Sequence, residues 1–131
     1  NGLKVATLLT EHEDIIQGGA FSRDGRRLTT GGVDERVIVW DLEQRRAIQS
    51  MKTNLIAASS VAFSADGQSL YVGSWDVNLR LWNFTKTNEM LSMRGHSAGV
   101  NAIALSPDGA ELISAGRDGT SRFWNLRSDE S

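Results

Sequence analysis

The stretch RVIVWD at residues 36–41 returns in related form as LRLWN at 79–83 and as SRFWN at 121–125. The tryptophans of these stretches, Trp40, Trp82 and Trp124, are 42 residues apart each time. A fixed period of this length is typical of repeat architectures, in which each repeat is one supersecondary unit. The repeat register therefore decides the fold.

Stacking the units gives seven columns with the same residue in all three, and no insertion or deletion interrupts them. Besides the tryptophans, these columns are Ala20/Ala62/Ala104, Ser22/Ser64/Ser106, Asp24/Asp66/Asp108, Gly25/Gly67/Gly109, Leu28/Leu70/Leu112 and Asp34/Asp76/Asp118. Chance does not explain such agreement, so the chain contains three consecutive copies of one unit.

The pattern within each unit is that of β-strands. In the third unit VNAIAL (100–105) is followed by a Ser-Pro-Asp-Gly turn, AELISA (110–115), an Asp-Gly turn and SRFWNL. Asp-Gly between two apolar runs is a strong hairpin signal. A fourth run appears as RAIQSMK (46–52) and EMLSMR (89–94). Four short antiparallel strands in 42 residues match one β-propeller blade, so we predict an all-β fold without helices.

These stretches, together with RGHSAGVNAIALSPDG at 94–109, resemble WD40 repeats over residues 3–126. The chain departs from that pattern in places, since Trp82 and Trp124 are followed by Asn rather than Asp. The resemblance implies four-stranded antiparallel blades with boundaries at 11–52, 53–94 and 95–126. It also implies a rigid, non-catalytic platform that binds peptides or proteins and needs no cofactor.

WD40 repeats commonly carry a structural hydrogen-bonded tetrad of His, Ser or Thr, Asp and Trp. Carried over by column, the tetrads are His12, Thr30, Asp34 and Trp40 in the first unit and His96, Ser114, Asp118 and Trp124 in the third. The second unit holds only a partial set, Asn54, Val72, Asp76 and Trp82. In a full tetrad the indole N–H, hydroxyl, imidazole and carboxylate can each find a partner.

The same Ser114, His96 and Asp118 could instead form a nucleophilic triad. Such a triad needs an accessible hydroxyl with an oxyanion hole beside it, and no Gly-x-Ser-x-Gly elbow surrounds Ser114. The serine column reads Thr30, Val72, Ser114, which is how a packing position varies. We therefore expect a structural network and no catalytic residue.

Candidate partner-binding residues lie on the face that carries the turns between the second and third strands. The residue before each tetrad Asp is Val33, Trp75 or Arg117, and Trp and Arg are enriched at binding hot spots. Trp75 either anchors a partner or packs onto a neighbouring loop. Gln17, Ser59 and Asn101 share a column near the channel mouth, where partner contact and simple solvent exposure both explain polar residues.

Composition excludes several other classes of function. The net charge is −2, from 14 Lys and Arg against 16 Asp and Glu, and no basic run suggests nucleic-acid binding. No apolar run reaches the roughly 18 residues that a membrane helix needs. There is no Cys, and the two His lack a paired ligand spacing, so we expect no disulfide and no metal site. A natural form would be cytoplasmic or otherwise intracellular.

Three blades fall short of the four to eight that propellers typically use, so both end sheets would lack a neighbour. LKVATLL (3–9) lies 42 residues upstream of RRAIQSM (45–51), the position of a fourth strand, whereas the last unit ends after its third strand. We therefore predict that residues 3–10 complete the last blade of a neighbouring chain. In WD40 propellers this arrangement is known as a Velcro closure.

Two chains would give six blades and three chains nine, and six lies within the usual range. The cyclic homodimer is thus favoured over the homotrimer. The start at Asn1 without Met and the tidy strand offset suggest an engineered or excised propeller segment that self-assembles. The alternative is a fragment of a natural WD40 interaction scaffold that binds a peptide or protein through Trp75 and Arg117.

Overall fold

The computed structural model of the chain describes residues 11–53, 57–77, 79–85 and 89–126. Within this part the chain forms strands and no helix, as predicted. The first sheet holds β1 (Ile16–Phe21), β2 (Arg27–Gly32), β3 (Arg36–Asp41) and β4 (Arg46–Lys52). The second holds β5 (Ala58–Phe63), β6 (Leu70–Ser74), β7 (Leu79–Asn83) and β8 (Glu89–Met93), and the third holds β9 (Val100–Leu105), β10 (Glu111–Gly116) and β11 (Ser121–Asn125).

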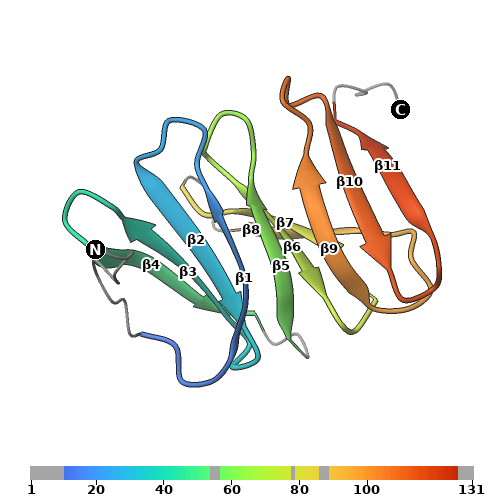
Figure 1. Cartoon of the computed structure of the whole chain (residues 1–131), viewed down its shortest axis with the longest axis horizontal. Coiled ribbons are helices and arrows are strands. Elements are labelled where there is room, and N and C mark those ends of the chain that lie inside the picture. Colours follow the sequence, from blue (N-terminus) through green and yellow to red (C-terminus); the bar gives the residue numbers. More distant parts are fainter. Residues whose placement is uncertain (1–10, 54–56, 78, 86–88, 127–131) are drawn as a thin grey trace, which may run out of the picture.

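The three sheets are antiparallel throughout and follow one another in chain order across the molecule (Figure 1). Their first strands face one another, because β5 lies against β1 on one side and against β9 on the other. This is the arrangement of successive propeller blades, so the sheets are called blades 1, 2 and 3. The middle blade has a neighbour on both faces and the end blades on one each.

The repeated Ser-x-Asp-Gly sequence builds the same tight turn between the first two strands of every blade. In blade 1 the Ser22 hydroxyl donates to Asp24 at 2.7 Å, and Asp24 accepts the Arg26 N–H at 2.9 Å. Gly25 has φ +75°, and its counterparts Gly67 and Gly109 both have φ +74°, a region that favours glycine. Local turn geometry alone thus explains why the Ser, Asp and Gly columns of this turn are identical in all three repeats.

The core lies at the two junctions between blades. At the first junction Val37 and Val39 of β3 share a cluster with Phe63, Leu70 and Trp82 of blade 2. A second cluster joins blades 2 and 3, and it includes Tyr71 and Leu79 from the middle blade with Val100 and Leu112 from the last. All residues of β5 are buried, because this strand is enclosed by both neighbours. In β3 the four residues Val37, Ile38, Val39 and Trp40 are all buried, which accounts for the apolar character of both sides of this strand.

Each blade has a forward face, turned toward the following blade, and a backward face, turned toward the preceding one. On the forward face Val39 is fully buried in blade 1, whereas Phe123 in the same column of blade 3 is 67 % exposed. On the backward face Phe63 of blade 2 is 4 % exposed, whereas Phe21 of blade 1 is 68 % exposed. Farther out on that same face of blade 1, Trp40 is buried. The exposed apolar surface on the backward face of blade 1 therefore lies at its inner strand, β1.

Candidate functional site

In blade 3 four predicted side chains meet in one hydrogen-bonded chain. The Trp124 indole N–H donates to the Ser114 hydroxyl oxygen at 2.8 Å, and Ser114 Oγ lies 2.7 Å from His96 Nε2. His96 Nδ1 lies 3.0 Å from Asp118 Oδ2. Since a carboxylate only accepts, Nδ1 carries the proton between His96 and Asp118, and a neutral ring then accepts the Ser114 proton at Nε2.

Blade 1 repeats this geometry with a threonine in place of the serine. Trp40 donates to the Thr30 hydroxyl at 2.9 Å, which lies 2.7 Å from His12 Nε2. His12 Nδ1 lies 3.0 Å from Asp34 Oδ2. The histidine comes from the loop before β1 and the aspartate from the turn between β2 and β3. The network therefore ties these two segments together at one end of the blade.

The two tetrad aspartates are held in their charged form. The backbone N–H of Ser97 and the hydroxyl of Thr120 donate to Asp118, and they lower the pKa of this carboxyl well below its usual value. Burial acts to raise the pKa of Asp34, but the N–H of Glu13, the His12 ring and the N–H of Arg36 outweigh it and lower that pKa. Hydrogen bonds to the ionised form are the common cause.

The burial of Ser114 and its bond to Trp124 suit the structural network better than the nucleophilic triad. The Ser114 side chain is fully buried, and its oxygen already accepts the Trp124 indole N–H. A hydroxyl in that place offers no approach to a substrate carbonyl carbon. The arrangement can hold a turn and a loop in register, which suits a structural role.

The middle blade has different residues and different contacts at the tetrad positions. Val72, in the hydroxyl column, is fully buried in the apolar cluster between blades 1 and 2, and Trp82 is fully buried as well. Ser74 is buried, and its hydroxyl oxygen accepts the Asp76 N–H at 3.2 Å. Asn54 lies outside the described residues.

Ser74 stands in a column that is glycine in the other two blades, where the tetrad crowds this position. A methyl group on Gly116 would lie 2.5 Å from His96 Nδ1 and 2.8 Å from Asp118 Oδ1, and one on Gly32 would lie 2.8 Å from Asp34 Oδ1 and 3.1 Å from His12 Nδ1. A side chain at this point is therefore crowded by both the histidine and the aspartate of a complete tetrad. The tetrad columns do not predict this relationship, and its signal in the sequence is the column Gly32, Ser74, Gly116.

Trp75 and Arg117, the two sharpest partner-binding candidates, are in contact with each other. The Arg117 guanidinium carbon lies 5.0 Å from the centre of the Trp75 ring, and Arg117 Nε donates to Asn101 Oδ1 at 3.2 Å. Gly99 lies against the Trp75 backbone, since a methyl group there would be 2.7 Å from the Trp75 carbonyl oxygen. Trp75 is thus partly packed by blade 3 and partly accessible.

The remaining candidates are dispersed. Gln17 is exposed, and Val33 is partly buried with its N–H donating to the Ile15 carbonyl oxygen at 2.8 Å. Solvent exposure, one of the two explanations for the polar residues of this column, does not apply to Ser59. It is 6 % exposed, and its hydroxyl donates to the carbonyl oxygens of Gly73 at 3.1 Å and Val100 at 2.6 Å. The second bond links blade 2 to blade 3, so this serine belongs to the junction.

The repeats match a known protein-family model. The model of the WD domain, G-beta repeat, matches residues 2–41, 49–83 and 87–125. The chain belongs to the WD40 family. No curated protein matches it.

Membership of the WD40 family implies a propeller scaffold for protein interactions, and WD40 proteins are generally non-catalytic. Among the described residues no group of three or more His, Asp or Glu could hold a metal ion. In the same part of the chain, no helix is long and apolar enough to span a membrane.

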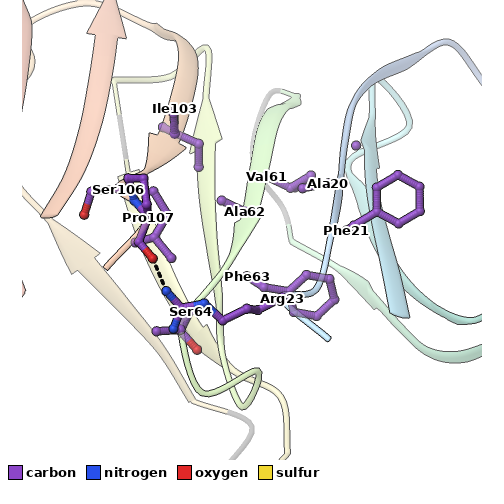
Figure 2. Close-up of a pocket in the computed structure, with 14 residues that line it drawn as sticks. Ala20, Phe21, Arg23, Val61, Ala62, Phe63, Ser64, Ile103, Ser106 and Pro107 are labelled. Carbon is purple, nitrogen blue, oxygen red and sulfur yellow. Dashed lines mark hydrogen bonds between the residues drawn. The ribbon is translucent and has the colours of Figure 1, made fainter. Parts of the chain in front are cut away.

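A cavity of about 320 Å³ runs along the inner strands β1, β5 and β9 of the WD40 segment (Figure 2). Small side chains line much of it, including Ala20, Ala62 and Ala104 from one column. Arg23, from the first turn of blade 1, donates to the Pro107 carbonyl oxygen of blade 3 across one end of the cavity. Among the described residues, the polar side chains that line the cavity are those of Arg23, Ser64 and Ser106.

Proposed function

We propose that this WD40 segment is a non-catalytic scaffold that completes its propeller by binding a second copy head to tail, so that two chains form six blades. The observation that carries the proposal is the exposure of Phe21 and Phe123, whose columns are covered at the internal junctions. What sets these two apart from other exposed apolar residues is that their columns are buried or partly buried wherever a neighbouring blade is present.

The internal junctions supply the template for the pairing. Phe63, the counterpart of Phe21, lies in the same cluster as Val39. Leu105 and Leu81, the next pair in those columns, pack against the second cluster. In a head-to-tail dimer the same columns bring Phe21 of one copy against Phe123 of the other, at two equivalent junctions.

The open edge of β11 supports the same assembly. In blade 2 the third strand pairs with β8, and Arg80 Nη1 donates to the Ser92 hydroxyl oxygen at 2.9 Å. Arg122 occupies the same column in β11, and in the described residues no strand lies beyond β11. The segment proposed to fill this edge, residues 3–10 of the second copy, lies outside the described residues.

Light scattering on a sizing column tests the proposal. A mass near twice 14.3 kDa supports the six-bladed dimer, and three times this mass indicates nine blades. A folded monomer over the accessible concentration range contradicts the proposal.

A second candidate is favoured by the contact between Arg117 and Trp75. The chain would then be part of a natural interaction scaffold that binds a peptide or protein on the face carrying these two residues. Trp75→Ala separates the candidates, because it should abolish capture of such a partner while leaving the mass on the sizing column unchanged. A partner that binds Trp75→Ala as well as the parent chain would count against this site.

A further inference from the structure

Three contacts hold Arg117 in place at the junction of blades 2 and 3. Its N–H donates to the Gly99 carbonyl oxygen at 2.8 Å, its Nε donates to Asn101, and its guanidinium lies over the Trp75 ring. One edge of the guanidinium is occupied by Asn101 and one face by the indole. The two Nη groups remain to donate outward, and Arg117 as a whole is exposed.

The charge of Arg117 is not neutralised by the residues around it. Within the part of the chain that the structure describes, no carboxylate oxygen lies within 4.0 Å of its guanidinium. The carboxylate next in sequence, Asp118, is directed to His96, Ser97 and Thr120. An arginine that is held in one orientation loses less freedom when it forms a paired hydrogen bond to a carboxylate.

We propose that Arg117 and Trp75 form a binding site for the side-chain carboxylate of an Asp or Glu in a protein partner. The two Nη groups would donate in parallel to the carboxylate, and the partly accessible Trp75 ring would contact the neighbouring apolar surface of the partner. The inference deepens the second candidate function, and it does not depend on ring closure.

Charge favours a single carboxylate over a polyanion. The same end of blade 1 carries the exposed acidic residues Glu11, Glu13 and Asp14, and the whole chain has a net charge of −2. A nucleic acid or a polyphosphate would meet these acids as well as Arg117, whereas nucleic-acid sites present clustered basic residues. One acidic side chain in an otherwise neutral or basic segment fits this surface best.

The test is a nuclear magnetic resonance titration of the full chain with a capped Gly-Gly-Glu-Gly-Gly peptide, and with the capped Gly-Gly-Gln-Gly-Gly peptide of equal length. We expect a saturable shift of the Arg117 Nε–H signal with the glutamate peptide alone, weakened by added salt. Arg117→Gln should abolish saturable binding. Trp75→Leu should weaken it about two- to fivefold through loss of the cation–π contact.

Arg26→Gln is the matched control, because it removes the same charge from an exposed arginine in the turn between β1 and β2. It should leave binding of the glutamate peptide unchanged. Equal binding of the two peptides, or unchanged binding by Arg117→Gln, overturns the carboxylate site. Tighter binding of an octathymidylate strand through Arg117 also overturns it. A shift with the glutamine peptide that is confined to the Trp75 indole would reject the carboxylate site and retain the scaffold function. The mass of the assembly reports on ring closure separately.

Discussion

Phe21 and Phe123 lie on the two outward faces of the blade series and are exposed to nearly the same extent, 68 % and 67 %. Phe63, one repeat after Phe21, is 4 % exposed, and Val39, two repeats before Phe123, is fully buried. The same columns are thus covered wherever a neighbouring blade is present. The two phenylalanines are the residues on which ring closure can be tested most directly.

Replacing either phenylalanine by glutamate should prevent dimerisation. Full burial of one such side chain is worth about 1.5–3 kcal/mol, and a closed dimer contains the contact twice, so the dissociation constant should rise at least about 100-fold. Light scattering over a dilution series of Phe123→Glu measures this. Leu91→Glu is the control, because Leu91 is 57 % exposed on β8 and away from both end faces. Equal weakening by Leu91→Glu would point to a general charge effect.

Ala115 should limit how closely the second copy approaches. Its column holds Gly31 and Gly73 at the internal junctions, where a methyl group would lie 2.8 Å from the Ala58 carbonyl oxygen or from Val100 Cγ1. Ala115→Gly removes such a methyl group at the closing junction and should tighten the dimer about tenfold, although glycine costs the strand about 0.5–1 kcal/mol.

Gly73→Ala is the counterpart of that change inside the chain. It should destabilise folding by about 1–3 kcal/mol in urea unfolding, because the added methyl group would lie 2.5 Å from Ser60 Oγ within blade 2 and 2.8 Å from Val100 Cγ1 of blade 3. A dissociation constant that Ala115→Gly leaves unchanged would show that the second copy does not dock as the internal blades do.

A complete tetrad in blade 2 should require three substitutions. Asn54→His with Val72→Ser supplies the histidine and the hydroxyl, but the Ser74 side chain stands where glycine is needed beside the imidazole. Adding Ser74→Gly should raise the free energy of unfolding above that of the double variant by about 1 kcal/mol. Ser74→Gly alone should lower it, because the hydroxyl no longer accepts the Asp76 N–H.

Thermal unfolding of the parent, the double, the single and the triple variant measures this coupling. Additive effects of the three substitutions would mean that the introduced imidazole does not contact residue 74.

Val77→Gly should stabilise the chain. Val77 has φ +78° and is 39 % exposed, and Gly119 holds the same turn position in blade 3 with φ +82°. A β-branched residue in this region is strained by roughly 1–2 kcal/mol, partly offset by the greater chain entropy of glycine when unfolded. Urea unfolding should show a gain of up to about 1 kcal/mol, and Gly119→Val should show a loss. A loss with Val77→Gly would mean that packing of the valine outweighs its backbone strain.

Stability should fall in acid through the tetrad aspartates. The pKa values of Asp34 and Asp118 are lowered in the folded chain, so their contribution is complete above the unfolded value of about 3.9 and is lost as the pH falls through the lower folded values. Asp118→Asn should therefore lower stability at neutral pH and flatten its decline below about pH 4. Urea unfolding at a series of pH values measures both effects, and an unchanged decline would remove Asp118 as a cause.

Much of the fold follows from local sequence signals. The Ser-x-Asp-Gly turns close through bonds within six residues, such as the Arg27 N–H to the Ser22 hydroxyl, and glycine takes the one φ that other residues avoid. The strand pattern and the 42-residue register add the pairing within each blade. The sequence also brings the four tetrad types to fixed positions, and their geometry in blades 1 and 3 follows from that register.

Other properties could not be predicted from the alignment of the three repeats, because they depend on which blade lies next to which. Gln17, Ser59 and Asn101 share one column, yet Ser59 alone of the three is buried, and its hydroxyl donates to the Val100 carbonyl oxygen of the following blade. Arg117 and Trp75 are 42 residues apart, and only the packing of blade 3 against blade 2 brings the guanidinium over the indole.

By itself the sequence determined the repeat, the strands, the turns and the set of tetrad residues, since these depend on neighbours in the chain and on one 42-residue period. The tertiary structure decided which of two identical phenylalanines, Phe21 or Phe63, is core and which is surface. Burial is a property of the atoms that surround a side chain, and for these columns those atoms belong to the adjacent blade.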